Sequence, residues 1–358
     1  MKTYEIAVIP GDGIGKEVVP EGIRILSAAG AKFGFGFRWR HFDWSCETYK
    51  TTGRMMPADG IAQLRDHDAI FLGAVGFPGV PDHVSLWGLL IPIRREFDQY
   101  VNLRPVRLLP GIVPALRDRK PGDIDFWIVR ENTEGEYSQI GGRLHASTAD
   151  EIVVQEAIFT RRGTDRIIRY AFELARRLGR DHVTSATKSN GIFYSMPFWD
   201  ERFATIAADY PDIRADQYHI DILAARFVMT PERFSVVVGS NLFGDILSDL
   251  GPGVTGTIAV APSANINPER LFPSMFEPVH GSAPDIAGQR IANPIGQIWS
   301  AAMMLDHLGQ AEAGNAVFHA IEKVLGSHDA PLTPDLGGKA STVDLGAAIE
   351  RALIGDRG

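Results

Sequence analysis

SVVVGSNLFGDILSD, residues 235–249, joins a β-branched apolar run to a segment with helical spacing. The same alternation occurs along the chain: short apolar runs predict strands, and the amphipathic stretches between them predict helices. This order predicts an α/β protein whose sheet is largely parallel and covered on both faces. The predicted strands are 6–9, 69–72, 126–129, 183–186 and 235–238, and the predicted helices are 16–29, 164–178, 198–209, 219–228, 242–250, 294–308 and 312–326.

The composition is that of an ordinary globular protein. The chain has 358 residues, a length that is enough for two domains, and 45% of its residues are hydrophobic. A formal net charge of −8 argues against a nucleic-acid or anionic-membrane partner, because no basic excess neutralises phosphates. The single cysteine, Cys46, rules out an intrachain disulfide, and we interpret it as structural. No membrane-length apolar run or secretory signal pattern is present, so we expect a cytoplasmic protein.

A glycine-rich turn follows the first predicted strand. Gly11, Gly13 and Gly15 resemble a Rossmann phosphate loop, but the G-x-G-x-x-G spacing requires glycine where Lys16 stands. No acidic residue ends a clear second strand about 20 positions later, as that nucleotide site requires. We therefore interpret the glycines as a tight turn.

The helix of the opening stretch carries two carboxylates on one face. Asp245 and Asp249 are one turn apart, where like charges repel unless a cation lies between them. Asp221, flanked by apolar residues, is a third candidate. Hard oxygen ligands suit Mg²⁺ or Mn²⁺. A solvated helix face is the alternative explanation, so the metal site is at this point a hypothesis.

Three arginines lie at or beside apolar segments. Arg94 follows one apolar run, Arg104 lies in a second, and Arg130 ends a predicted strand. A buried guanidinium is costly unless it meets an anion, and its fork suits carboxylates or phosphates. An ordinary salt bridge explains any one of them, but the three together favour an anionic substrate.

Two further residues can move protons. Lys188 directly follows a predicted strand, and a lysine there acts as a base when desolvation or a nearby cation favours its neutral form. Tyr137 can donate a proton. A surface lysine and a hydrogen-bonded interior tyrosine are the alternative interpretations.

Residues 277–294 combine small side chains with a turn, so their backbone can approach a ligand closely. Asp285 can accept a hydrogen bond from a ribose hydroxyl. It would repel a 2′-phosphate, which favours NAD over NADP.

The segment 136–155 has turn signals at Gly141 and Gly142 between alternating polar and apolar residues. This pattern predicts an extended hairpin or arm. The arm is either a surface hairpin or a clasp between two subunits.

Together these motifs resemble the β-decarboxylating dehydrogenases, the family of the isocitrate and 3-isopropylmalate enzymes. The matches extend from Gly11 to Gly338, and the most specific are NLRP at 102–105, RENTEG at 130–135, NLFGDILSD at 241–249 and HGSAPD at 280–285. Within the family, DHVSLWG at 82–88 and FDQYVN at 97–102 are most similar to the branch that acts on tartrate and D-malate.

The resemblance implies an isocitrate/isopropylmalate dehydrogenase-like α/β fold, not a Rossmann fold, with two domains and an active-site cleft between them. It places the cofactor-binding domain at 1–102 plus 256–358. The substrate and dimerisation domain follows at 103–255, with the arm at about 136–155. It also implies a homodimer with shared active sites, in which the neighbouring subunit supplies Lys188 and Asp221.

The resemblance assigns each candidate a role. Arg94, Arg104 and Arg130 would hold the carboxylates of a small dicarboxylate substrate. Asp221, Asp245 and Asp249 would hold Mn²⁺ or Mg²⁺, and a requirement for K⁺ stays open. Lys188, relayed to Asp221, would take the proton of the C2 hydroxyl, and Tyr137 would protonate C3. NAD would contact His280, Gly281, Ser282, Ala283, Asp285, Ile286 and Asn293.

The implied reaction is NAD-dependent oxidation and oxidative decarboxylation of a (2R)-hydroxy dicarboxylic acid, with tartrate and D-malate as expected substrates. Between His83 and Arg94 the chain carries no formal charge, so the γ-carboxylate of isocitrate would lack a fixed partner. Trp87 stands where isopropylmalate enzymes have a glutamate, and its ring fills space that an isopropyl group needs. The isopropyl group can also pack on the indole, so 3-isopropylmalate is the alternative substrate.

Two other classes stay open. A metal-dependent hydrolase can use the same aspartates and arginines but needs no nucleotide loop. A non-catalytic subunit of an oligomeric dehydrogenase would keep the fold, yet such a subunit is expected to lose site residues, and here the candidates are all present.

Overall fold

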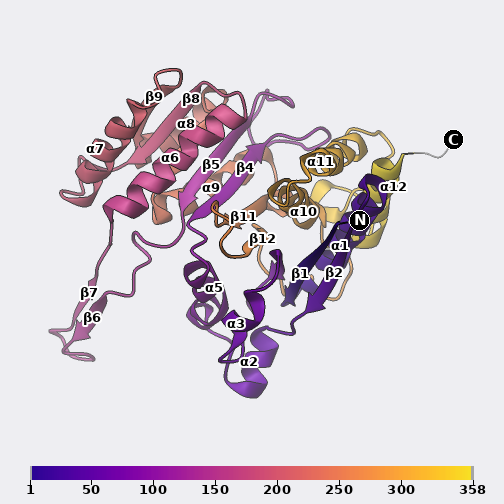
Figure 1. Ribbon diagram of the computed structural model, residues 1–358, viewed down its shortest axis with the longest axis horizontal. Helices are drawn as coiled ribbons and strands as arrows, with labels where there is room; N and C mark the ends of the chain where they lie inside the picture. Colours follow the sequence, from indigo (N-terminus) through magenta and orange to yellow (C-terminus); the bar gives the residue numbers. More distant parts are fainter. Residues whose placement is uncertain (1, 356–358) are drawn as a thin grey trace. The chain divides into compact units, whose positions relative to one another are not determined.

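The computed structural model describes residues 2–355 and divides them into two compact units (Figure 1). The first holds the described residues of 1–99, 104–124 and 251–358, and the second holds 100–103 and 125–250. The chain passes between the units through β4 (Val101–Arg107) and through α9 (Asn241–Thr255).

The strands of the first unit lie in the order β2-β1-β3-β12-β11. The first four are parallel, and β11 runs antiparallel to β12. All of β3 is buried, as expected for a strand covered on both faces. The strands are β1 (Lys2–Gly11), β2 (Phe35–His41), β3 (Ala69–Ala74), β11 (Pro262–Ile266) and β12 (Ser274–Pro278).

In the first unit, α1 begins directly after the glycine-rich turn and packs against α10 and α12 (Figure 1). A π-helical turn at Leu86–Leu90 separates α4 from α5. The helices are α1 (Gly15–Phe33), α2 (Cys46–Thr52), α3 (Gly60–Leu64), α4 (Asp82–Ser85), α5 (Ile91–Glu96), α10 (Ile295–His307), α11 (Ala311–Leu325) and α12 (Thr342–Ile354). Within residues 2–355, no helix combines the length and the apolar composition needed to cross a bilayer.

The strands of the second unit lie in the order β5-β10-β8-β9 and are all parallel. α6 packs on three of these strands and also contacts α7. The elements are β5 (Asp125–Glu131), α6 (Arg161–Arg177), β8 (His182–Thr187), α7 (Ser195–Ala207), β9 (Arg214–His219), α8 (Ile220–Met229) and β10 (Val236–Gly239).

Every strand and helix predicted from the sequence is present, with ends shifted by a few residues. The α/β class and the largely parallel strand order are confirmed, and the β11–β12 pair is the antiparallel exception. The unit boundaries differ from the expected domain limits: 104–124 and 251–255 lie in the first unit, and 100–102 lie in the second. There Arg107 forms an ion pair with Glu322 of α11 at 3.7 Å, and the Leu108 amide donates to the Ile124 carbonyl over 3.0 Å.

The predicted hairpin is confirmed. β6 (Gly141–Leu144) and β7 (Ile152–Gln155) pair in antiparallel register and project from the rest of their unit (Figure 1). Apolar side chains on it, including Leu144 and Val153, are exposed. A role as a clasp between subunits stays a prediction.

Candidate active site

Three predicted site residues of the second unit meet at the start of α9. Arg130 is the penultimate residue of β5 and is in register with Gly239, the last residue of β10, and β10 leads into α9. Arg130 Nη1 forms an ion pair with Asp245 Oδ1, and the Tyr137 hydroxyl donates to Asp245 Oδ2 over 2.8 Å. A cation, a proton donor and a carboxylate therefore share one place in the fold.

Two residues that the sequence did not single out hold Arg130 in place. Asn241 Oδ1 accepts hydrogen bonds from Arg130 Nε at 3.1 Å and from Nη2 at 2.7 Å. Gly244 leaves room for the arginine, since a Cβ there would lie 2.5 Å from Arg130 Cβ. The guanidinium is buried, and these partners offset its loss of hydration.

The Tyr137 phenol is held in its protonated form. Burial, together with the hydrogen bond to Asp245, raises the pKa of Tyr137 to about 12. At neutral pH the phenol therefore carries a proton that it can donate. Asp249 follows Asp245 one turn later on α9, as the spacing predicted.

A buried carboxylate organises the loop between β5 and Tyr137. Glu131 accepts hydrogen bonds from the Thr133 amide at 2.9 Å, the Thr133 hydroxyl at 2.8 Å and the Glu134 amide at 2.9 Å. Burial nevertheless raises the pKa of Glu131 to about 7. This turn brings Tyr137 back toward α9.

Lys188 and Asp221 form a second charged pair. Lys188 follows β8, Asp221 lies in the first turn of α8, and Nζ donates to Oδ1 over 2.9 Å. This hydrogen bond lowers the pKa of the Asp221 carboxyl. Asp221 is exposed, and residues 2–355 contain no group of three candidate metal ligands.

The predicted arginines of the first unit are buried. Arg94 Nη2 donates to Glu277 Oε1 over 2.8 Å, and the same oxygen accepts from Asn265 Nδ2 at 2.7 Å. Arg104 lies in β4. Burial at the ends of apolar runs is as the sequence predicted, but the Glu277 partner was missed because it lies on a distant strand.

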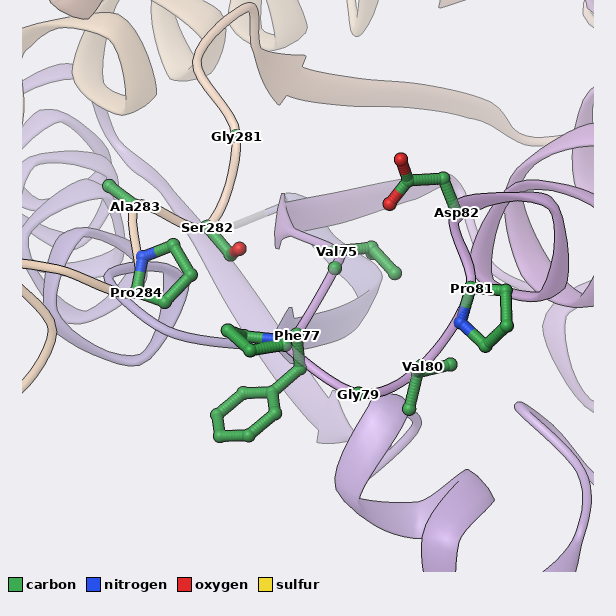
Figure 2. A pocket seen from close by; sticks show the side chains of 12 residues that line it. Val75, Phe77, Gly79, Val80, Pro81, Asp82, Gly281, Ser282, Ala283 and Pro284 are labelled. Atoms are coloured by element: carbon green, nitrogen blue, oxygen red, sulfur yellow. The ribbon is translucent and has the colours of Figure 1, made fainter.

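A pocket of about 650 Å³ lies in the first unit (Figure 2). One wall is the loop of Gly281, Ser282 and Ala283, three of the residues assigned to the cofactor. The other wall is residues 75–82, which follow β3 and were not predicted. Figure 2 shows Ser282 facing the pocket from one loop and Phe77 lying on the other.

The glycine-rich turn supports both walls of this pocket. Gly13 has φ +52, and a Cβ there would lie 2.0 Å from the Ser282 carbonyl oxygen. The fully buried Asp12 accepts from the Gly76 amide at 3.1 Å and from the Cys46 amide at 3.0 Å. The tight turn is thus confirmed. Burial raises the pKa of the Cys46 thiol to about 12, which agrees with its structural interpretation.

The remaining residues assigned to the cofactor differ in their surroundings. Burial lowers the pKa of His280, and its Nε2 has no hydrogen-bond partner within residues 2–355. Asp285 is exposed, and Ile286 packs against the start of α1. Asn293 Nδ2 donates to Asp335 over 3.0 Å, so this amide has a structural partner.

The family model for isocitrate/isopropylmalate dehydrogenases matches residues 5–349. The chain belongs to this family. D-malate dehydrogenase [decarboxylating] from Escherichia coli is 61% identical over 361 residues, with 99% of each chain covered. Tartrate dehydrogenase/decarboxylase from Pseudomonas putida is 60% identical, with 98% of each covered. The solved isocitrate dehydrogenase from Methylococcus capsulatus superposes with a TM-score of 0.88 at 33% identity, over 98% of this chain and all of that one.

As a member of the isocitrate/isopropylmalate dehydrogenase family, the chain has residues that fit a nicotinamide nucleotide. The pocket volume lies in the range of small-ligand sites, and two closely approaching backbone loops form its walls. His280 lies beside the Gly281 wall, and its Nε2 has no hydrogen-bond partner within residues 2–355. Asp245 and Asp249 fit a divalent metal by donor chemistry, since both offer carboxylate oxygens from one helix.

Proposed function

We propose that the protein is an NAD- and divalent-metal-dependent dehydrogenase that oxidises and decarboxylates (2R)-hydroxy dicarboxylic acids, D-malate and tartrate in particular. The observation that carries the proposal is the meeting of Arg130, Tyr137 and Asp245 at the start of α9. The names of the relatives at 61% and 60% identity support the choice of substrates. D-malate would yield pyruvate and CO₂.

The arginines bind the substrate in this proposal. Arg94, Arg104 and Arg130 hold its carboxylates, since bidentate guanidinium groups suit planar anions. Arg130 is already oriented by Asn241, so little side-chain freedom is lost when a substrate carboxylate replaces Asp245 as its anion.

Asp245 and Asp249, together with the partner subunit's Asp221, hold Mn²⁺ or Mg²⁺. The metal supplies Lewis acidity at the C2 hydroxyl when bound, and NAD supplies the acceptor for the C2 hydride. This assignment requires the homodimer with shared sites that the family resemblance implies. The exposed apolar residues of the β6–β7 arm support its role as a clasp between the two subunits of that dimer.

A lysine and a tyrosine move two protons. The partner subunit's Lys188 takes the proton of the C2 hydroxyl and can pass it to the partner's Asp221, to which it is hydrogen-bonded. When the C3 carboxylate leaves as CO₂, its bonding electron pair forms an enolate. The Tyr137 hydroxyl then donates its proton to C3, which its protonated state at neutral pH permits.

NAD binds in the proposal between the 281–284 loop and residues 75–82, with Asp285 on the adenosine ribose. The exposed carboxylate of Asp285 would repel a 2′-phosphate and so selects NAD over NADP. We place the enzyme in the cytoplasm, where NAD and free dicarboxylates are available.

The test follows NADH absorbance with NAD and Mn²⁺, with and without K⁺, using D-malate, both tartrates and 3-isopropylmalate in parallel while CO₂ is detected. NADH from D-malate and tartrate supports the proposal. Dominant kcat/KM on 3-isopropylmalate would overturn the substrate assignment. No NADH from any substrate, with no nucleotide binding, would favour a hydrolase or a non-catalytic subunit.

Trp87 tests the substrate assignment directly. It is half-buried, it lies on the π-helical turn, and Arg95 stacks over its ring at 5.0 Å. If the ring excludes an isopropyl group, Trp87→Ala raises kcat/KM for 3-isopropylmalate relative to D-malate. A fall in that ratio would mean that the ring binds the isopropyl group instead.

A further inference from the structure

We propose that Glu136 is a positioning residue of this enzyme. Its carboxylate fastens the Tyr137 segment to the start of α9 and so holds the Tyr137 phenol against Asp245. The inference rests on the proposed function, in which Tyr137 gives its proton to C3. No role follows for Glu136 from its sequence pattern alone, because it precedes the tyrosine in an ordinary polar turn.

Both oxygens of Glu136 bind the beginning of α9. Oε1 accepts from the Ser240 hydroxyl at 2.7 Å, and Oε2 accepts from the Leu242 amide at 3.0 Å. Ser240 immediately precedes the helix, and Leu242 lies in its first turn. Helix starts have unpaired amides and favour negative charge, so the carboxylate is well placed to bind there.

The neighbouring side chain reaches one turn further along the same helix. Tyr137 contacts Asp245, while Glu136 contacts the residues on either side of Asn241. Asn241 in turn donates to the Glu134 carbonyl over 3.0 Å. Consecutive residues of the loop thus follow the helix, and Glu136 binds its first turn directly before Tyr137 in the chain.

The chain after Tyr137 offers little support of its own. Residues 139–156 are exposed and form the β6–β7 arm, which consists of the two strands, the loop between them and the residues on either side. Ser138 binds the Glu156 carbonyl, which is also on the arm. Glu136 is therefore a charged attachment of this segment to α9, beside the Tyr137 hydroxyl, the Asn241 contact and the Arg130 guanidinium 5.5 Å from the Tyr137 ring.

A purely structural helix cap would affect stability but not proton transfer. The two roles separate in the exchange of pyruvate methyl protons with D₂O, which needs a group that removes a proton from C3 and returns one to it, but no hydride transfer. The matched control is Glu173, a carboxylate of the same unit that accepts from the Tyr210 hydroxyl at 2.6 Å and belongs to no site.

The experiment compares wild type, Glu136→Gln, Glu136→Ala and Glu173→Ala as Mn²⁺-loaded enzymes at a temperature where all are folded. We expect Glu136→Ala to lower pyruvate exchange and kcat on D-malate about 10- to 100-fold, the loss typical of a misplaced catalytic group. Glu136→Gln should fall between, because one amide oxygen can still accept. KM for NAD should stay within twofold of wild type in the Glu136 variants, and every measured rate of Glu173→Ala should stay within twofold of wild type.

Wild-type exchange in both Glu136 variants, or equal losses in Glu136→Ala and Glu173→Ala, would overturn the positioning role. If Glu136→Ala does not fold, the nearly isosteric Glu136→Gln decides, and its crystal structure should show the Tyr137–Asp245 contact lengthened or lost. An unchanged contact with unchanged exchange contradicts the proposal. If wild type itself produces no NADH and no exchange, the proposed function has failed, and the inference fails with it.

Discussion

Replacing Gly244 by alanine should disable Arg130 without unfolding the protein. The added Cβ would lie 2.5 Å from Arg130 Cβ, 2.6 Å from Cγ and 3.0 Å from Cα. Ordinary carbon contacts begin near 3.5 Å, so Arg130 and the helix must separate by about 1 Å. A displacement of that size at a substrate-binding group costs about 100-fold in rate. Overpacking adds a stability loss of about 1–3 kcal/mol.

The assay measures kcat/KM for D-malate by NADH formation and the free energy of unfolding by urea titration. Gly253→Ala is the matched control, because Gly253 lies in the same helix with nothing within 4 Å of its added Cβ. Alanine is the better helix former, so this variant should keep wild-type kcat/KM and gain up to about 1 kcal/mol.

The result that refutes the reasoning is Gly244→Ala with wild-type kcat/KM. It would mean that Arg130 relaxes along α9 without losing its contacts to Asn241 and Asp245. A loss of stability alone, with kcat/KM retained in the folded fraction, would limit Gly244 to packing.

Three further outcomes follow from the same structure. Glu131 should make wild type less stable as pH rises from about 4.5 to 7, because over this range the buried carboxyl of the folded state keeps a proton that the unfolded state has released. Relative to Glu131→Gln, the free energy of unfolding of wild type should change by about 3 kcal/mol over this range. Urea titrations that give the same difference between the two proteins at pH 5 and pH 7.5 would contradict the prediction. Asp12→Ala should weaken NADH binding at least about tenfold in a fluorescence titration, because the Gly76 amide loses its buried acceptor and this wall of the pocket becomes less ordered. Unchanged NADH binding with a lower free energy of unfolding would mean that Asp12 contributes to stability alone. EDTA should abolish NADH formation from D-malate and Mn²⁺ should restore it, whereas full activity after chelation would remove the metal from the proposal.

The parts of the fold that the sequence predicts are those with a local signal. β3 and β10 are continuous apolar runs because they are covered on both faces, and the pattern alone identifies them. β9 is missed because its sequence, RADQYH, has no apolar run, and it becomes a strand by pairing with β8. β2 is missed as well, because it is an edge strand of the sheet and several of its residues are exposed.

The candidate site divides in the same way. Residue types and the one-turn spacing indicate Asp245 and Asp249, but the partners of Asp245 lie 108 and 115 residues away in the chain. The register of β5 against β10 brings Arg130 to α9, and no local pattern encodes that register. Glu277 and Glu136 were missed for this reason, because each binds residues that are distant in sequence.

In the proposed function, the Arg130–Asp245 cluster receives both a cation and a dianion. Arg130 and a divalent metal would compete for the Asp245 carboxylate, since both are positive and only one can be its close partner. A dicarboxylate would resolve the competition, because it would offer Arg130 a replacement anion. The side chain of Asp245 is one-third exposed, whereas that of Arg130 is almost fully buried. The carboxylate is therefore the accessible half of the pair. In the proposed function the exchange would begin there, and Asn241 would keep Arg130 in place while its partner changes.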